Sequence, residues 1–496
     1  MKETLRINLN DNVAVALREL HEGDKVEVHD QTIVLKETVS RGHKFAITTI
    51  GRDQHVMKYG FPIGYATQEI GIGNWVHTHN TKTNLKGIEE YSYLPRRSEN
   101  PFEQKNLTFK GYRRKDGKVG IRNELWIVPT VGCVNGVAEG ILKRFIKEVG
   151  DITPFENTLV LKHNYGCSQL GDDHVNTTTI LQNAVRHPNA GGVLVLGLGC
   201  ENNEMQSFKE SLGDYDEERV KFLVSQEVSD EMEEGVKLLL EIYKAAGGDH
   251  REDVPLSELK IGLKCGGSDG FSGITANPLL GRFSDFLVAQ GGTTVLTEVP
   301  EMFGAEALLM ERAANEEVFH KIVALINDFK QYFMTYNQPV YENPSPGNKA
   351  GGITTLEDKS LGCTQKAGTS VVMDVLKYGE RLETKGLNLL SAPGNDLVAA
   401  SALASSGCQL VLFTTGRGTP FGTFVPTLKV STNSAIYKLK GHWIDYNAGT
   451  LVEDDSPDEV LEDFVNYIIS IASGEQVNNE KNDFREIAIF KSGVTL

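Results

Sequence analysis

Four apolar runs of the chain end in the same way, and this repetition constrains the fold more than any other feature. Each run has the length of a buried strand, passes into a turn that combines cysteine with glycine, and is followed by a helix-like segment. This alternation is typical of α/β units built on a largely parallel sheet, so we predict a large α/β region from Gly111 onward. The turns are Gly132-Cys133, Gly166-Cys167, Gly199-Cys200 and Cys265-Gly266.

The first part of the chain has a different pattern. Up to about residue 92 it contains short β-type runs such as VAVAL, KVEVH and FAITTI, separated by Gly, Asp and Asn turn signals, which predict a small β-rich module. A polar linker follows, and a Gly-rich break near residues 245–256 divides the α/β region. The expected parts are the β module at 1–92, the linker at 93–110, and α/β parts at 111–250 and 251–496.

Charge and composition exclude several classes of protein. With 50 basic and 67 acidic residues the 496-residue chain carries a net charge of −17, which repels polyanions, so we expect no nucleic-acid partner. No apolar stretch approaches the roughly 20 residues that cross a bilayer, and the start lacks a secretory pattern. We therefore expect no membrane partner, a cytoplasmic location, and six cysteines present as thiols.

The cysteines of the four turns are candidate metal ligands. Parallel strands present their carboxyl ends at one edge of a sheet, where α/β proteins bind ligands, so Cys133, Cys167, Cys200 and Cys265 could converge. Thiolates bind borderline metals and iron–sulfur clusters. The alternative is that each cysteine is a small buried apolar residue at a strand end.

A second candidate group lies in HNYGCSQLGDDH. His163, Asp172, Asp173 and His174 surround Cys167 within 12 residues, and imidazole with carboxylate suits Fe²⁺ or Mn²⁺. Either histidine, or Asp172, could also act as a general base, with Asp173 as a metal ligand. The alternative is that the two aspartates only stabilise the start of a helix near His174.

A third candidate is the sequence Trp75-Val76-His77-Thr78-His79-Asn80 at the end of the β module. If this segment is a strand, His77 and His79 point to the same face and could bind one ion or a polyol. The alternative is a pair of solvated loop histidines.

The last candidates are Gly-rich loops with cationic or polar side chains. Exposed backbone N–H groups beside Lys or Arg form a site for a carboxylate or phosphate. The side chains concerned are Ser268, Asp269, Asn348, Lys349 and Arg417. Residues 343–368, which contain Lys349, are rich in Gly, Pro, Lys and Ser and predict a long loop of the kind that is usually functional or mobile. Lys349 and Arg417 could equally be surface charges.

Long motifs across the whole chain resemble the altronate/galactarate dehydratase family of sugar-acid hydro-lyases. They include YGFPIGYA, YGCSQLGDDH, LKCGGSDGFSGITANP, NPSPGNKAGG and TTGRGTPFG. His77-Thr78-His79-Asn80 and Gly362-Cys363-Thr364 place the chain nearer the altronate branch than the galactarate branch. The resemblance implies an N-terminal SAF module of the β-clip type, a large α/β catalytic region, an iron requirement with manganese as an alternative, and a role in hexuronate breakdown.

The resemblance also implies a reaction: loss of water across C2 and C3 of a small sugar acid, D-altronate, to give 2-dehydro-3-deoxy-D-gluconate. Removal of the C2 proton next to a carboxylate needs a stabilising metal and a base. We expect His174 or His163 to transfer the proton, and Lys349 and Arg417 to hold the carboxylate. His77 and His79, followed by Asn80, would contact the metal or the hydroxyl groups.

Three alternatives stay open at this stage. An iron–sulfur cluster held by three strand-end thiols could replace mononuclear Fe²⁺, because several hydro-lyases use such a centre. The substrate could be a related acid such as galactarate. The protein could also be a non-catalytic sugar-acid sensor, although its many thiol and imidazole groups favour an enzyme, which could be a homo-oligomer.

Overall fold

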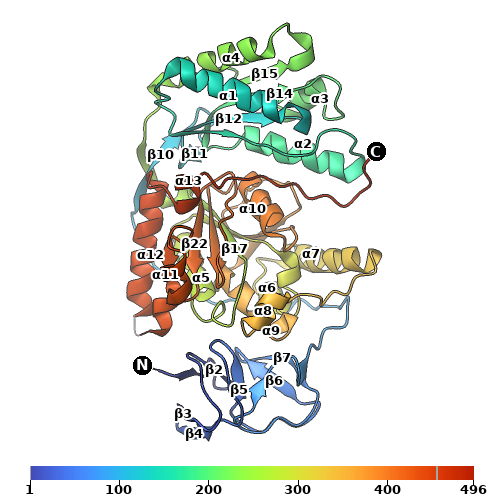
Figure 1. The fold of residues 1–496 in the computed structure, drawn as a ribbon, viewed down its shortest axis with the longest axis vertical. Helices are drawn as coiled ribbons and strands as arrows, with labels where there is room; N and C mark the ends of the chain where they lie inside the picture. The colour runs from blue at the N-terminus through green and yellow to red at the C-terminus, as the bar shows by residue number, and fades with distance from the viewer. Residues whose placement is uncertain (1, 454–455) are drawn as a thin grey trace.

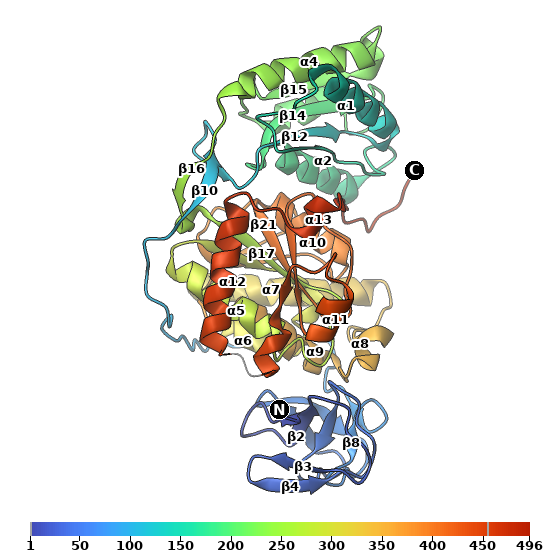
Figure 2. The same ribbon diagram turned by 60° about the vertical axis from the view of Figure 1, so that its left-hand side comes forward.

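The computed structural model describes residues 2–453 and 456–496, which form three parts along the long axis of the molecule (Figure 1). A β module lies at one end, a seven-stranded α/β unit in the middle and a four-stranded α/β unit at the other end, and the turned view has the same order (Figure 2). The predicted class, a small β-rich module followed by α/β units with parallel sheets, is confirmed.

The β module consists of short antiparallel strands around two small apolar cores. One sheet has the order β1 (Thr4–Leu5), β2 (Val13–Ala16), β5 (Lys44–Ala46), β8 (Trp75–Val76). A hairpin joins β3 (Lys25–Val28) to β4 (Gln31–Val34), and a third sheet has the order β6 (His55–Lys58), β7 (Phe61–Ala66), β9 (Thr81–Lys82). Ala305 and Leu361 of the middle unit complete one of the two cores, so the module packs directly on that unit.

The four-stranded unit contains three of the predicted strand-to-cysteine turns. Its parallel strands have the order β13 (Asn157–Val160), β12 (Glu124–Pro129), β14 (Ala190–Gly197), β15 (Val220–Val224). Its helices are α1 (Asn135–Val149), α2 (Gly171–Val185), α3 (Met205–Leu212) and α4 (Glu231–Ala245). A small antiparallel sheet of β11 (Val119–Gly120), β10 (Thr108–Arg113) and β16 (Glu252–Pro255) forms where the chain enters and leaves this unit.

The seven-stranded sheet of the middle unit is parallel throughout. Its order is β19 (Val372–Leu376), β20 (Gly386–Leu390), β18 (Thr293–Leu296), β17 (Lys260–Cys265), β21 (Leu410–Thr415), β22 (Thr427–Ser431), β23 (Tyr446–Asn447). Its longer helices are α5 (Ala276–Ala289), α7 (Glu316–Thr335), α10 (Asp396–Ser405) and α12 (Pro457–Ala472). The shorter ones are α6 (Glu306–Met310), α8 (Pro346–Ala350), α9 (Leu356–Cys363), α11 (Ser434–Leu439) and α13 (Asn478–Lys481).

The prediction of a loop at residues 343–368 is wrong, because α8, α9 and a 3-10 helix (Thr364–Ala367) occupy most of it. The Ser345 side chain caps α8, and Thr355 caps α9 by accepting a hydrogen bond from the backbone N–H of Asp358. Every residue of α9 is buried, so the helix lacks the polar face that identifies a surface helix in a sequence.

The two α/β units share one apolar core and buried ion pairs. Trp126 and Val193 of the four-stranded sheet pack in the same cluster as Val295 and Val411 of the seven-stranded sheet. Arg122 also donates to Glu480 across the same boundary. None of the helices in the described part of the chain has the length and apolar character needed to cross a bilayer.

Candidate active site

Two cysteines and a glutamate meet at the carboxyl edge of the seven-stranded sheet. Cys265 is the last residue of β17, Glu301 ends a short 3-10 helix (Val299–Glu301) after β18, and Cys363 ends α9. The two Sγ atoms are 3.4 Å apart, and Glu301 Oε2 lies 3.1 Å from Cys265 Sγ and 3.2 Å from Cys363 Sγ. All three side chains are buried, and a group of this composition could hold a borderline divalent metal.

Three buried lysines surround this group. Lys366 Nζ lies 2.8 Å from Cys265 Sγ, and Lys359 Nζ donates to Glu301 Oε1 at 2.7 Å. Lys264 is paired with Glu298 at 2.6 Å. Burial opposes ionisation of Glu301, but Lys359 and Lys366 outweigh it and hold the Glu301 pKa at about 2. Each of these buried lysines has a carboxylate or thiol partner. The charged groups at this edge of the sheet therefore compensate one another.

Several predicted substrate-binding residues lie next to this network. Lys359 Nζ also reaches Asn348 Oδ1 at 3.3 Å, and Asn348 Nδ2 donates to the backbone oxygen of Ser268 at 2.8 Å. Arg417 Nη1 donates to the backbone oxygen of Gly347 at 3.3 Å, which brings the GRGTP loop beside the start of α8. Arg417 is exposed, and Lys349 is half-buried without an ion pair among the described residues.

The carboxylate of Asp269 is engaged in hydrogen bonds between loops and is not free to bind a ligand. It accepts hydrogen bonds from the side chains of Thr432 and Asn433 and from the backbone N–H of Phe271. Burial raises the Asp269 pKa against the effect of these hydrogen bonds. The contacts hold the loops after β17 and β22 together.

The N-terminal module contributes histidines to the same region. His77 Nδ1 is 3.0 Å from Thr354 Oγ1, and His43 Nε2 is 3.2 Å from the backbone oxygen of Ala350. Burial, reinforced by Lys44, lowers the His77 pKa to about 3, so the imidazole is neutral. The strand ends at Val76, so the two histidines do not share a strand face; both lie in the turn that follows, with His77 buried and His79 exposed.

Asn80 supports this turn. Its Oδ1 accepts a hydrogen bond from the His77 backbone N–H at 3.0 Å, and its Nδ2 donates to the backbone oxygen of Trp75 at 2.8 Å. The rings of Trp75 and His77 stack with centroids 5.3 Å apart. The side chain of Asn80 thus fixes the position of His77.

Cys133, Cys167 and Cys200 lie in the other α/β unit, exposed on adjoining loops at the carboxyl edge of the four-stranded sheet. The backbone N–H of Ser168 donates to Asn202 Oδ1 at 2.7 Å, and that of Asn203 to the Gly166 oxygen at 3.0 Å. The structure therefore brings these three loops together but places Cys265 on a different sheet, with Cys363. Metal binding by the three exposed thiols stays a prediction.

The remaining predicted residues also belong to the four-stranded unit. His163 Nε2 is 2.8 Å from the Pro129 oxygen, and its Nδ1 accepts from the Tyr165 backbone N–H, so both ring nitrogens have backbone partners. His174, on α2, has a buried Nδ1 without a hydrogen-bond partner among the described residues, and Asp172 is exposed. In both views α2 lies in the four-stranded unit, whereas α8 and α9 face the N-terminal module (Figure 1 and Figure 2).

Asp173 has a different environment from the one expected of a metal ligand. It accepts hydrogen bonds from the backbone N–H groups of Ser492 and Gly493 at 2.9 and 2.8 Å. Lys491 lies 3.9 Å away. The carboxylate thereby fixes the C-terminal segment to the first turn of α2.

Sequence reasoning missed Glu301, Lys359, Lys366 and the ligand role open to Cys363. Glu301 follows the apolar strand β18 within a few residues, so its position at a strand end was the available signal. Cys363 and the two lysines lie in the stretch that was interpreted as a loop.

Comparisons with known proteins match the chain in three consecutive segments. Residues 2–84 match the model "Altronate/galactarate dehydratase SAF domain", residues 111–247 match "D-galactarate dehydratase/Altronate hydrolase, second domain", and residues 256–495 match "D-galactarate/Altronate dehydratase, C-terminal". The chain is 69% identical to altronate dehydratase of Bacillus subtilis over the full length of both proteins. It is 60% identical to altronate dehydratase of Escherichia coli over 99% of both, and 33% identical to the galactarate dehydratase (L-threo-forming) of that organism over 95% of this chain and 93% of that protein.

Proposed function

The chain belongs to the altronate/galactarate dehydratase family, and from this premise we propose that it converts D-altronate into 2-dehydro-3-deoxy-D-gluconate and water. One observation carries the choice of substrate: identity to two altronate dehydratases is 69% and 60% over almost the whole chain, against 33% for galactarate dehydratase. Since its six cysteines are unpaired, we also propose that it acts in a reducing compartment, the cytoplasm.

We propose that a divalent metal, Fe²⁺ in preference to Mn²⁺, binds Cys265, Cys363 and Glu301. The donor set fits, because thiolates with one carboxylate suit a borderline ion and the three donor atoms lie within 4.8 Å of one another. The Lys366 ammonium donates to Cys265 Sγ at 2.8 Å. When bound, the metal supplies Lewis-acid stabilisation of the negative charge that develops beside the substrate carboxylate.

The substrate carboxylate would be held by Lys349 and Arg417. Lys349 follows Asn348 in α8, and Arg417 lies in the loop that contacts the start of this helix; Lys359 connects Asn348 to Glu301. A protein of net charge −17 repels an anionic substrate, so local cations with free donors are needed to bind it.

For proton transfer at C2 we propose His77. Its imidazole is neutral, and the contact of Nδ1 with Thr354 Oγ1 fixes the ring and leaves Nε2 without a hydrogen-bond partner among the described residues. Lys44 donates to the same Thr354 oxygen and to Asp358, so a proton path extends into the buried interface. This choice replaces His163, whose nitrogens both have backbone partners, and His174, which lies in the other unit.

The test is a comparison of substrates with the purified, Fe²⁺-reconstituted protein under reductant. We expect formation of a 2-keto acid from D-altronate at a rate at least tenfold above that from galactarate, because a site built for one hydroxyl configuration leaves polar groups unpaired with another. Faster turnover of galactarate, or no turnover by protein with full metal occupancy, would reject the proposal.

The three exposed thiols of the four-stranded unit support one alternative, an iron–sulfur cluster. Metal analysis of serine variants separates the two centres. We expect C363S to lose bound iron while C167S keeps it, with no absorption near 400 nm in either protein. Loss of iron and of a 400 nm band in C167S alone would assign the metal to Cys133, Cys167 and Cys200 instead.

A further inference from the structure

A cavity of about 780 Å³ lies at the edge of the four-stranded sheet opposite the exposed cysteines. It is lined by the first residues of β14 and β15, by the hairpin at residues 113–118, and by the end of α2. Arg381, from the segment between β19 and β20, reaches it from the middle unit. These are the amino-terminal ends of strands in both units, whereas α/β proteins bind substrates at the carboxyl ends. The cavity is therefore separate from the candidate active site.

Most charged side chains of this cavity already have partners. Arg114 and Arg219 share Asp249, at 3.8 and 2.7 Å, and Lys118 pairs with Asp116. The other rim cations are paired as well: Arg113 with Glu252, and Lys115 with Asp216 and Glu218. Asp214 and Glu217 also line the cavity and are exposed.

Two guanidinium groups lack such a partner. Arg186, at the end of α2, makes one long hydrogen bond, from Nη2 to the Ser211 oxygen at 3.4 Å. Arg381 has no hydrogen bond or ion pair within residues 2–453 and 456–496; the acids that favour its charged form are Asp116, which is bound to Lys118, and Glu383. Both side chains are half-buried. Burial lowers the pKa of both, and Arg381 lowers that of Arg186 further by repulsion.

Two like charges held together without a partner are unfavourable unless an anion neutralises them. Guanidinium groups bind phosphate oxygens in a bidentate geometry, and two of them match the two charges of a phosphate monoester. Beside them the half-buried Tyr215 offers apolar surface for an uncharged carbon skeleton, and Val185, Pro188 and Leu212 lie buried in the wall of the cavity. The volume is within the range of sites for small metabolites.

We propose that Arg186 and Arg381 form a binding site for a small phosphate monoester, such as a sugar phosphate, remote from the active site. One arginine belongs to the four-stranded unit and the other to the seven-stranded unit, so the ligand joins the two units. The proposal rests on the cavity and its charges and is independent of the substrate assigned above.

Calorimetric titration with glucose 6-phosphate tests this site. The probe carries a phosphate and no carboxylate, and its binding here is distinguished from binding at the cationic loops of the candidate active site by its loss in R186Q and R381Q. At constant ionic strength we expect saturable binding to the holoenzyme, and an affinity reduced about tenfold or more in R186Q and in R381Q. R113Q is the matched control, because Arg113 lines the same cavity but is exposed and paired with Glu252, and it should bind as the wild type does.

Two further measurements make the result decisive. The melting temperatures of R186Q and R381Q without ligand should equal or exceed that of the wild type, since each change removes an uncompensated charge, and this excludes misfolding as the cause of lost binding. Glucose should not bind. Wild-type affinity in both variants, equal loss in R113Q, or absence of binding at millimolar glucose 6-phosphate would overturn the proposal. Equal affinity for inorganic phosphate would overturn the choice of an ester.

Discussion

Asp358 joins the N-terminal module to the middle unit by two buried ion pairs. Its carboxylate lies 2.9 Å from both Lys44 Nζ and Lys58 Nζ, and all three side chains are almost fully buried. Removing one partner of a buried group leaves uncompensated charge, which costs far more than loss of an exposed pair.

We therefore expect D358N to lower the free energy of unfolding at pH 7 by about 3–5 kcal/mol, measured by urea denaturation. D253N is the control, because Asp253 forms an exposed pair with Lys110 at 2.8 Å, and its effect should stay below about 1 kcal/mol. Burial raises the Asp358 pKa, but the two lysines hold it well below 3.8. The stabilisation by the Asp358 ion pairs is thus present above pH 4 and lost on acidification. The free energies of unfolding of the wild type and D358N should therefore converge below pH 4.

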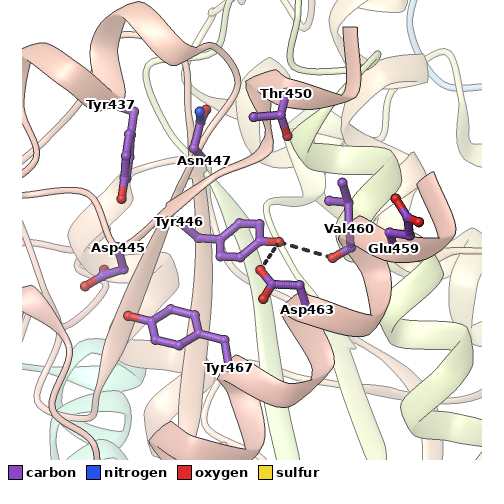
Figure 3. Close-up of a pocket in the computed structure, with 9 residues that line it drawn as sticks. All are labelled: Tyr437, Asp445, Tyr446, Asn447, Thr450, Glu459, Val460, Asp463 and Tyr467. Carbon is purple, nitrogen blue, oxygen red and sulfur yellow. Dashed lines mark hydrogen bonds between the residues drawn. The ribbon is translucent and has the colours of Figure 1, made fainter. Parts of the chain in front are cut away.

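The pKa of Asp445 is shifted in the opposite direction to that of Asp358. It lines a cavity of about 620 Å³ with Tyr437, Tyr446 and Tyr467 (Figure 3). Its carboxylate accepts hydrogen bonds from two backbone N–H groups, but burial outweighs them and raises its pKa from 3.8 to about 6. Since the folded state holds the proton more tightly, this group makes the protein less stable as the pH rises from 4 to 6.

The expected result for D445N is a flatter stability curve. Between pH 4 and 6 the free energy of unfolding of the wild type should fall, relative to D445N, by up to about 2 kcal/mol. Urea midpoints measured at half-unit intervals test this. Parallel curves for the two proteins would show that Asp445 titrates at its ordinary pKa.

At the scale of elements, the strand ends were predictable and the buried helix was not. The apolar runs before Cys133, Cys200 and Cys265 are the strands β12, β14 and β17, because fully buried parallel strands are apolar on both faces. Helix α9 has no exposed face, and its glycine and polar residues are accommodated by tertiary contacts. Cys363 and Lys359, which lie on this helix, were missed for that reason.

The caps of α9 and α7 allow a matched test of this element. Loss of the Thr355 cap in T355A should lower the free energy of unfolding by about 1–2 kcal/mol. We also expect weaker iron binding, since α9 positions Cys363 at its other end. N315A removes the corresponding cap of α7, where Asn315 accepts from the Val318 backbone N–H at 2.9 Å, and should leave iron affinity unchanged. If T355A and the wild type bound iron with equal affinity, the geometry of α9 would not control the metal-binding group.

For the whole molecule, sequence patterns predicted the order of its parts but not how they pack. Local alternation of strands and helices in the sequence predicts each of the two parallel sheets. Their common core instead depends on contacts between residues more than a hundred positions apart, such as Trp126 and Phe424. The same limit explains why Cys265 was grouped with the other strand-end cysteines. A strand-end position does not reveal which of two sheets a strand joins.

The shared core predicts that the two α/β units unfold together. Trp126 reports on the four-stranded unit and Trp443 on the seven-stranded unit, and Arg122 and Glu480 form a buried pair between them at 2.7 Å. E480Q leaves Arg122 without its anion and should destabilise the protein by about 3 kcal/mol. In single-tryptophan variants, fluorescence of Trp126 and of Trp443 should shift to the same lower midpoint. A shift at one tryptophan only would mean that each unit folds on its own core.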